Sequence, residues 1–409
     1  MRTAPVLLLA LAAAVGLHAR QTGLPAAAPE SIGLAPARLA EATSLLDRFV
    51  ADGKIAGAVA AVARRGKVGY LKAVGVRDLE SRASMTPDTL FRIYSMTKAV
   101  TAVAVMMLHD EGRFRLDDPV SKFLPEFAHV AVVESPGAAP RPPARAITVE
   151  DLLLHTSGLS HRTSELYRTL QVRSRADTLP VFVGKITKAP LMEDPGTRFR
   201  YSEASTVLGR LVEVWTGRAF DAFVDERVLV PLGMRDTVWW VDETRRPRLA
   251  TVYGPAPDGR LRVVDMEEVP VTERAPLIEG AVGLVSTAPD FLRFAQMLLN
   301  GGELDGVRLL RPDTAARMVT NGLPEPILRA RGSGAMGWGL ANVDVVMNPD
   351  GLRYPANRGE YGWDGTGGTI FWVDPSTSTI VVLMTQSSPP NPDGLRQQFK
   401  TLVQAAVTP

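Results

Sequence analysis

A serine and a lysine three residues apart are the strongest candidates for chemistry in this sequence. Ser95 and Lys98 stand at the start of an apolar stretch, and residues at positions i and i+3 share one helix face. A serine at a helix N-terminus faces unpaired backbone N–H groups and the positive end of the helix dipole. Because burial disfavours the charged form of a lysine, Lys98 could act as a base near neutral pH and activate Ser95 as a nucleophile.

The same pair has a structural alternative. A serine that caps a helix, followed by a lysine whose ammonium group reaches solvent, would leave the same sequence pattern. The segment 95–98 is nevertheless the only SxxK in a chain that contains just eight lysines among its 46 basic residues.

A tyrosine follows at Tyr201, in a Tyr-Ser-Glu segment that ends at Glu203. It comes after the turn at 194–197 and at the start of another helical stretch. A tyrosine beside a serine nucleophile could relay a proton to the leaving group. A buried tyrosine whose hydroxyl is satisfied by the fold is the commoner case.

Glycine is dense in the segment 362–369, which contains Trp363 and Gly365 and leads into a strong strand. Glycine lets the backbone approach a ligand closely. N–H groups of an edge strand at this place could complete an oxyanion hole, the set of donors that binds the negative oxygen of a tetrahedral intermediate. The alternative is a glycine-rich β-turn without a chemical role.

Other chemistries lack the residues or the context that they need. The segment 332–337 fits GxGxxG, but no strand is expected before it and no helix after it, and the chain has no GxSxG elbow. Cysteine is absent and the five histidines lack the spacing of metal ligands, so we expect no metal, no cofactor and no cysteine nucleophile. His155 is expected to form a local hydrogen bond at a helix end.

The composition argues against nucleic acid as a partner, and the N-terminal residues suggest where the protein is located. The net charge of +2 gives no electrostatic footprint for nucleic acid, so the expected partner is a small molecule, an ester or an amide. Residues 1–19 are typical of a signal peptide, because the apolar run 6–17 is too short to span a bilayer. A buried helix or an uncleaved anchor is the alternative. We expect a periplasmic or secreted protein with no stable membrane span after signal cleavage.

The elements that must position these residues follow from hydrophobic periodicity. The spacing predicts helices over 36–52, 96–108, 148–155, 203–216, 219–229, 288–299 and 393–407, and strands over 56–64, 68–74, 369–373 and 379–385. Strand signals therefore lie at both ends of the chain and helices lie in the middle.

This order predicts an α/β plus all-α protein. One antiparallel sheet, built from both ends and flanked by the terminal helices, would carry an inserted helical region. The expected domains are a discontinuous sheet domain, 30–90 and 280–409, and a mostly helical domain, 91–279. The proline-rich loop 134–146 and the segment 322–334 are expected to lie outside the core.

The combination of Ser95 and Lys98, Tyr201 and the glycine-rich turn resembles the penicillin-recognising serine hydrolases. The likeness is closest to the class C β-lactamase-like branch that includes the family VIII carboxylesterases, and it covers about residues 30–405. Five further segments carry it: FRIY at 91–94, LLLHTSGL at 152–159, PGTRFRYS at 195–202, PLGM at 231–234 and GLVSTAPDF at 283–291.

The resemblance implies a β-lactamase/transpeptidase-like fold, with the site between the sheet domain and the helical domain. It implies that Ser95 is the acylated nucleophile and Lys98 its general base. Tyr201 would protonate the leaving group and help to activate the deacylating water. The backbone N–H groups of Ser95 and Thr366 would form the oxyanion hole.

Two departures from the family pattern bear on the substrate. The family's Lys-Thr-Gly or His-Thr-Gly triplet is replaced by 363–365, so Trp363 stands in the place of a cation, and Glu203 replaces the asparagine of Tyr-x-Asn. Both changes disfavour anionic β-lactams and D-Ala-D-Ala peptides. We expect an exported hydrolase of small neutral esters that works through an acyl-enzyme on Ser95. The alternatives are a β-lactamase or D,D-peptidase/D-aminopeptidase with the same residues, and a non-catalytic binding protein of this fold.

Overall fold

The computed structural model describes residues 23–408, apart from 134, 136, 267–270 and 333. The predicted signal peptide, residues 1–19, lies outside the described residues, so it stays a prediction. Among the residues that are described, no helix is long and apolar enough to cross a membrane.

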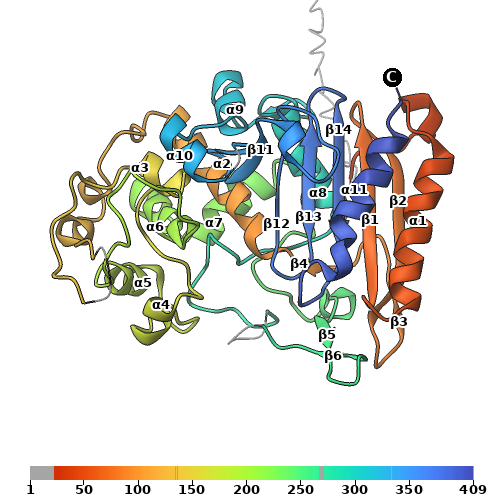
Figure 1. Cartoon of the computed structure of the whole chain (residues 1–409), viewed down its shortest axis with the longest axis horizontal. Coiled ribbons are helices and arrows are strands. Elements are labelled where there is room, and N and C mark those ends of the chain that lie inside the picture. Colours follow the sequence, from red (N-terminus) through yellow and green to blue (C-terminus); the bar gives the residue numbers. More distant parts are fainter. Residues whose placement is uncertain (1–22, 134, 136, 267–270, 333, 409) are drawn as a thin grey trace, which may run out of the picture.

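One eight-stranded antiparallel sheet organises the fold (Figure 1). Its strand order is β10-β11-β12-β13-β14-β1-β2-β3, so strands from the two ends of the chain meet where β14 pairs with β1. The predicted sheet built from both ends is therefore confirmed. The strands are β1 (Gly57–Arg64), β2 (Lys67–Asp78), β3 (Ala83–Ser84), β10 (Met336–Gly339), β11 (Val343–Val346), β12 (Tyr361–Asp364), β13 (Ile370–Asp374) and β14 (Thr379–Met384).

The adjacent strands β1 and β14 lie inside the sheet and are buried on both faces, which explains their continuous apolar sequences. Val59 and Ala61 of β1 belong to one hydrophobic cluster, whereas Ala58, Ala60 and Val62 belong to another. This alternation follows from the two-residue period of a strand. The sheet therefore separates two cores.

Helices from the two ends of the chain cover one face of the sheet. The helix α1 (Pro36–Ala51) begins with proline at its first turn and buries apolar residues at a three- and four-residue spacing. It packs against α11 (Leu395–Ala406), which lies beside it in Figure 1. On the opposite face α8 (Ala288–Leu299) contacts β1 and β14.

The helical region lies at the end of the molecule that is farther from α1 (Figure 1). It contains α3 (Val149–Leu153), α4 (Glu165–Thr169), α5 (Leu179–Ile186), α6 (Ala204–Thr216) and α7 (Phe220–Val224), which runs into a π-helical turn, Asp225–Leu229. The remaining helices are α9 (Pro312–Met318) and α10 (Glu325–Ala330), and the small two-stranded pairs are β4 (Phe91–Arg92) with β7 (Val285–Ser286), β5 (Tyr253–Pro255) with β6 (Leu261–Val263), and β8 (Glu303–Leu304) with β9 (Val307–Arg308). The domain boundaries expected from the sequence stay a prediction.

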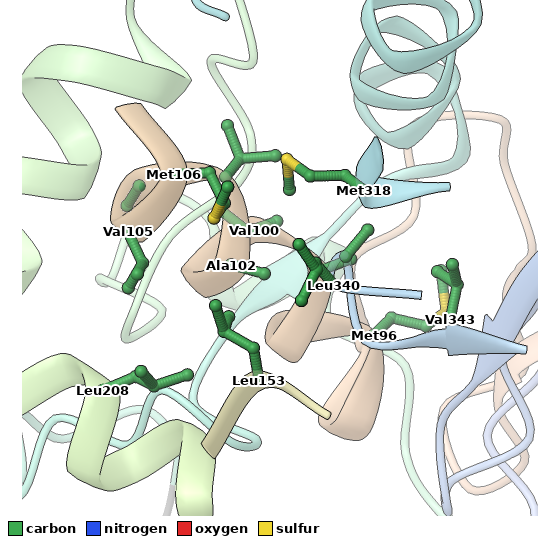
Figure 2. Packing of buried hydrophobic residues seen from close by; sticks show 14 of the residues in the cluster. Met96, Val100, Ala102, Val105, Met106, Leu153, Leu208, Met318, Leu340 and Val343 are labelled. Atoms are coloured by element: carbon green, nitrogen blue, oxygen red, sulfur yellow. The ribbon is translucent and has the colours of Figure 1, made fainter. Parts of the chain in front are cut away.

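The helix α2 (Thr97–Asp110) lies between the sheet and the helical region and is buried from Thr97 to Leu108. Figure 2 shows its side chains among Leu153 of α3, Leu208 of α6 and Val343 of β11. A helix that is apolar nearly all the way round belongs in such a place. Any side chain on its first turn is therefore held by core packing.

One expectation about the core is wrong. None of the described residues in 134–146 is buried, as expected for the proline-rich loop, but 322–334 is partly in the core. It forms α10, and Leu323, Ile327 and Leu328 join the same hydrophobic cluster as α2. The prolines of this segment start the helix instead of preventing it.

The packing around α2 predicts a large cost for truncating Leu153, which is fully buried. Leu153→Ala should lower the free energy of unfolding by about 2–5 kcal/mol. Leu170→Ala is the matched control, since Leu170 is 45% exposed and should change stability by less than about 0.5 kcal/mol. Denaturant unfolding followed by circular dichroism measures both, and equal losses would contradict the placement of Leu153.

Candidate active site

Ser95 and Lys98 meet at the start of α2. Ser95 lies in a 3-10 turn, Tyr94–Met96, that leads directly into the helix. Tyr94 has φ of 42°, in the left-handed region that non-glycine residues seldom adopt, and such strain is often held at functional sites. The Lys98 Nζ donates to Ser95 Oγ at 3.3 Å and to the carbonyl of Ala281 at 3.0 Å. The predicted serine–lysine pair is thus in contact.

The surroundings of Lys98 change its protonation. The side chain is fully buried, and burial lowers its pKa to about 7, because an ammonium group loses its hydration there. The Glu203 carboxylate opposes this shift, whereas the Arg162 guanidinium adds to it. At neutral pH a large share of Lys98 is therefore the free amine, which can accept the proton of Ser95.

Tyr201 lies over the same pair. Lys98 Nζ is 4.6 Å from the centroid of its ring, and Trp363 Nε1 donates to its hydroxyl at 3.1 Å. The hydroxyl also lies within hydrogen-bonding reach of Ser95. Burial raises the pKa of Tyr201 above its ordinary value, so the phenol is protonated and can donate.

His155 does not form the local hydrogen bond that was expected. Its backbone has φ of 54°, and its Nδ1 shares a hydrogen bond of 3.0 Å with the hydroxyl of Ser202, 47 residues away. Its ring centroid is 4.8 Å from that of Tyr201. Burial lowers the pKa of His155 well below its usual value, so it is neutral beside Lys98. His155 therefore supports the segment 201–203.

Glu203 is buried at the start of α6, with 1% of its surface exposed. Its Oε1 accepts from the backbone N–H of Arg162 at 3.4 Å, and its Oε2 has no hydrogen-bond partner among the described residues. A carboxylate in low dielectric acts on its neighbours over several ångströms. Here it holds the pKa of Lys98 higher than burial alone would.

The glycine-rich turn packs against the segment that precedes Ser95. A Cβ at Gly365 would come within 2.5 Å of the Ile93 carbonyl, so only glycine fits there, and the Thr369 hydroxyl donates to the same carbonyl at 3.4 Å. The N–H of Thr366 has no hydrogen bond to the part of the chain that is described. Since β12 pairs with β11 only at Tyr361 and Gly362, its end beyond Gly362 is an edge, as the sequence suggested.

Comparison with known proteins agrees with this arrangement. A profile of the β-lactamase family matches residues 42–406. The chain belongs to the β-lactamase family. It is 31% identical over 386 residues to esterase EstB of Burkholderia gladioli, covering 88% of this chain and 93% of the esterase. It is 33% identical over 348 residues to penicillin-binding protein 4 of Amycolatopsis lactamdurans, covering 83% of each.

Among solved structures, EstCE1, described as a hydrolase with promiscuous acyltransferase activity, aligns with a TM-score of 0.79. It is 26% identical, and the alignment covers 90% of this chain and 98% of that one. The expected β-lactamase/transpeptidase-like fold is therefore confirmed. The members of this β-lactamase family are serine hydrolases that act on small substrates. Among the described residues no cluster of side chains could hold a metal ion.

Sequence reasoning missed one charged residue of this site. Arg162 follows the His-Thr-Ser-Gly-Leu segment, and its Nη1 is buried without a hydrogen-bond partner among the described residues. It interacts electrostatically with Lys98. One arginine among 38 carries no signal of its own. Its place in a loop beside a recognised family segment is the only clue that could have singled it out.

The two charges beside Lys98 should move the pH dependence of the reaction in opposite directions. Only neutral Lys98 accepts a proton, so kcat/KM for an activated ester should rise with pH through a midpoint near 7. Glu203→Gln removes a charge that raises this pKa, so the midpoint should fall. Arg162→Gln removes a charge that lowers it, so the midpoint should rise.

The control for this pair is Glu226→Gln on the surface, which should leave the midpoint unchanged. Glu279 and Asp364 also act on Lys98, and they stay in place in all three variants. Shifts of the same sign in Glu203→Gln and Arg162→Gln would contradict the assignment of Lys98 as the titrating base.

Proposed function

We propose that this chain is an exported serine hydrolase that cleaves small neutral carboxylic esters through an acyl-enzyme on Ser95. The observation that carries the proposal is the contact between Ser95 Oγ and a fully buried Lys98 whose pKa lies near 7. A serine hydroxyl is a weak nucleophile unless a neighbouring base removes its proton. A buried amine within 3.3 Å is such a base.

Acylation then proceeds in a defined order. Lys98 takes the proton of Ser95 as Oγ attacks the ester carbonyl, and the N–H groups of Ser95 and Thr366 bind the developing oxyanion. When the bond to the alcohol breaks, the protonated Tyr201 gives its proton to the leaving oxygen. The phenolate is reprotonated by the ammonium of Lys98, 4.6 Å from the ring, which restores both groups.

Deacylation reverses these roles. A water molecule attacks the acyl carbonyl while the neutral amine of Lys98 removes its proton, and the Tyr201 hydroxyl helps to orient the water. The same two N–H groups bind the second oxyanion, and the proton passes to Ser95 as it leaves. The acid is released with the enzyme in its starting state.

Substrate preference is inferred from the wall beside Tyr201. The Trp363 indole contacts the Tyr201 ring and stands where the family places a cation. Trp338 packs edge-on against the same indole, with ring centroids 4.6 Å apart. Aromatic walls favour uncharged groups, because they offer contact area without a partner for a carboxylate. The similarity to esterase EstB supports esters, whereas that to a penicillin-binding protein keeps amides as the alternative.

Ser95→Ala should abolish hydrolysis of p-nitrophenyl butyrate and labelling by a fluorophosphonate. Ser286→Ala is the control, since Ser286 is another buried serine but its hydroxyl shares a hydrogen bond with that of Thr237. It should retain turnover. Robust turnover by Ser95→Ala would overturn the assignment, and a wild-type chain that never labels would favour a non-catalytic binding protein.

A substrate panel separates the ester reading from its alternative. Short p-nitrophenyl esters should be cleaved with higher kcat/KM than nitrocefin or D-alanine p-nitroanilide. Faster hydrolysis of either of these two would favour a β-lactamase or a D-aminopeptidase that uses the same side chains.

Export is proposed from the pattern of residues 1–19 alone. When the chain is expressed in a bacterial host with residues 1–19 in place, a shortened chain should be found outside the cytoplasm. Mass spectrometry would identify its new N-terminus. A full-length chain that stays in the cytoplasm would contradict export and leave the catalytic proposal untouched.

A further inference from the structure

An arginine from the far end of the chain holds the glycine-rich turn. Arg396 lies on the buried face of α11, with 8% of its surface exposed. Its Nη1 donates to Asp364 Oδ2 at 2.5 Å. Its Nη2 donates to the carbonyls of Gly365 and Thr369 at 3.0 and 3.1 Å.

The residues that carry these three acceptors flank Thr366, whose N–H group is proposed to bind the oxyanion. Gly365 and Thr369 close the turn with their own hydrogen bond, N–H to carbonyl, at 2.8 Å, and Thr366 lies inside it. On the other side the turn presses against Ile93, where a Cβ on Gly365 would not fit. The turn is therefore clamped between α11 and the strand that leads to Ser95.

The geometry of the contact needs a guanidinium group. Its planar fork can reach one carboxylate and two carbonyls at once, whereas a lysine ammonium acts as a compact point charge. A buried ion pair is by itself weak evidence for a gain in stability, because desolvation opposes it. Two of the three bonds go to backbone carbonyls of the turn, so the contact fixes where the turn lies.

We propose that Arg396 is a positioning residue that aims the Thr366 N–H at the oxyanion. The proposal rests on the ester-hydrolase function above, since it concerns a step of that reaction. Arg396 acts through the turn, because its bonds go to Asp364, Gly365 and Thr369 and none goes to Ser95 or Lys98. A donor placed about 1 Å away from its working position can cost about 100-fold in rate.

A cavity offers a direct way to test this. Arg396 lines a cavity of about 280 Å³ between α11 and the sheet, together with Asn391, Gln397 and Trp363. The Nε of Arg396 has no hydrogen-bond partner among the described residues. Truncation to alanine would enlarge this space, so a free guanidinium ion could occupy the place of the lost group.

Arg396→Ala should lower kcat about 100-fold with KM nearly unchanged, when activity is counted per site titrated with fluorophosphonate. Millimolar guanidinium chloride should restore part of the lost kcat, and methylammonium chloride should not. A kcat within about 2-fold of wild type, or a loss that guanidinium leaves unchanged, would overturn the positioning role.

Two further variants make the result specific. Arg293→Ala removes another buried arginine that binds one carboxylate, Asp305, and two backbone carbonyls, those of Leu232 and Gly23, none of which belongs to the site. It should lose stability but keep kcat per titrated site. Arg396→Lys keeps a charge but not the fork, so it should lose most of the kcat even if Arg396→Ala does not fold, and full activity would overturn the proposal. These results are distinct from a failure of the proposed function, which would show as ester turnover that does not depend on Ser95.

Discussion

The burial of one amine is the constraint on which the site depends. Lys98 has no access to solvent and makes hydrogen bonds only to Ser95 and to the Ala281 carbonyl among the described residues. Leaving it charged there without a paired carboxylate would cost several kcal/mol. The fold accommodates the residue because its pKa falls to about 7. The property that makes Lys98 difficult to bury is therefore the one on which its proposed role as a base rests.

The rest of the structure keeps water away from that amine. The helix α2 is buried from Thr97 to Leu108, between the sheet and α6, so its first turn cannot move without disturbing the core. Tyr201 covers the amine from the helical region, and Trp363 holds the Tyr201 hydroxyl from β12. Segments around Lys98, Tyr201, Ala281 and Trp363 thus meet at one place, which explains why the site needs the whole fold.

The sequence predicted those features of the fold and the site that depend on short sequence patterns. The serine–lysine spacing, the apolar α2 and the strands β1 and β14 all follow from short-range periodicity, and the structure has them. The glycines at 365 and 367 indicated that the backbone there approaches another group closely. Both of them lie against the Ile93–Tyr94 segment. Short strands such as β10 and β11 were missed, because four residues give too little pattern.

What could not be read from the sequence depends on long-range contacts. The bond from His155 to Ser202 joins residues 47 apart, and those of Arg396 cross about 30 residues from α11 to the turn. The buried part of 322–334 depends on a neighbouring core that no local pattern shows. Arg162 matters only because the fold places it beside Lys98.

The most direct test is the titration of Lys98 itself. With only eight lysines in the chain, ¹³C-labelled lysine should give a spectrum simple enough to assign the Lys98 resonance by its loss in Lys98→Met. We predict a titration midpoint near pH 7 for Lys98 in the folded protein, well below the ordinary value of about 10.4 for a lysine side chain in water. A midpoint for Lys98 close to that ordinary value would contradict the assignment of Lys98 as the base.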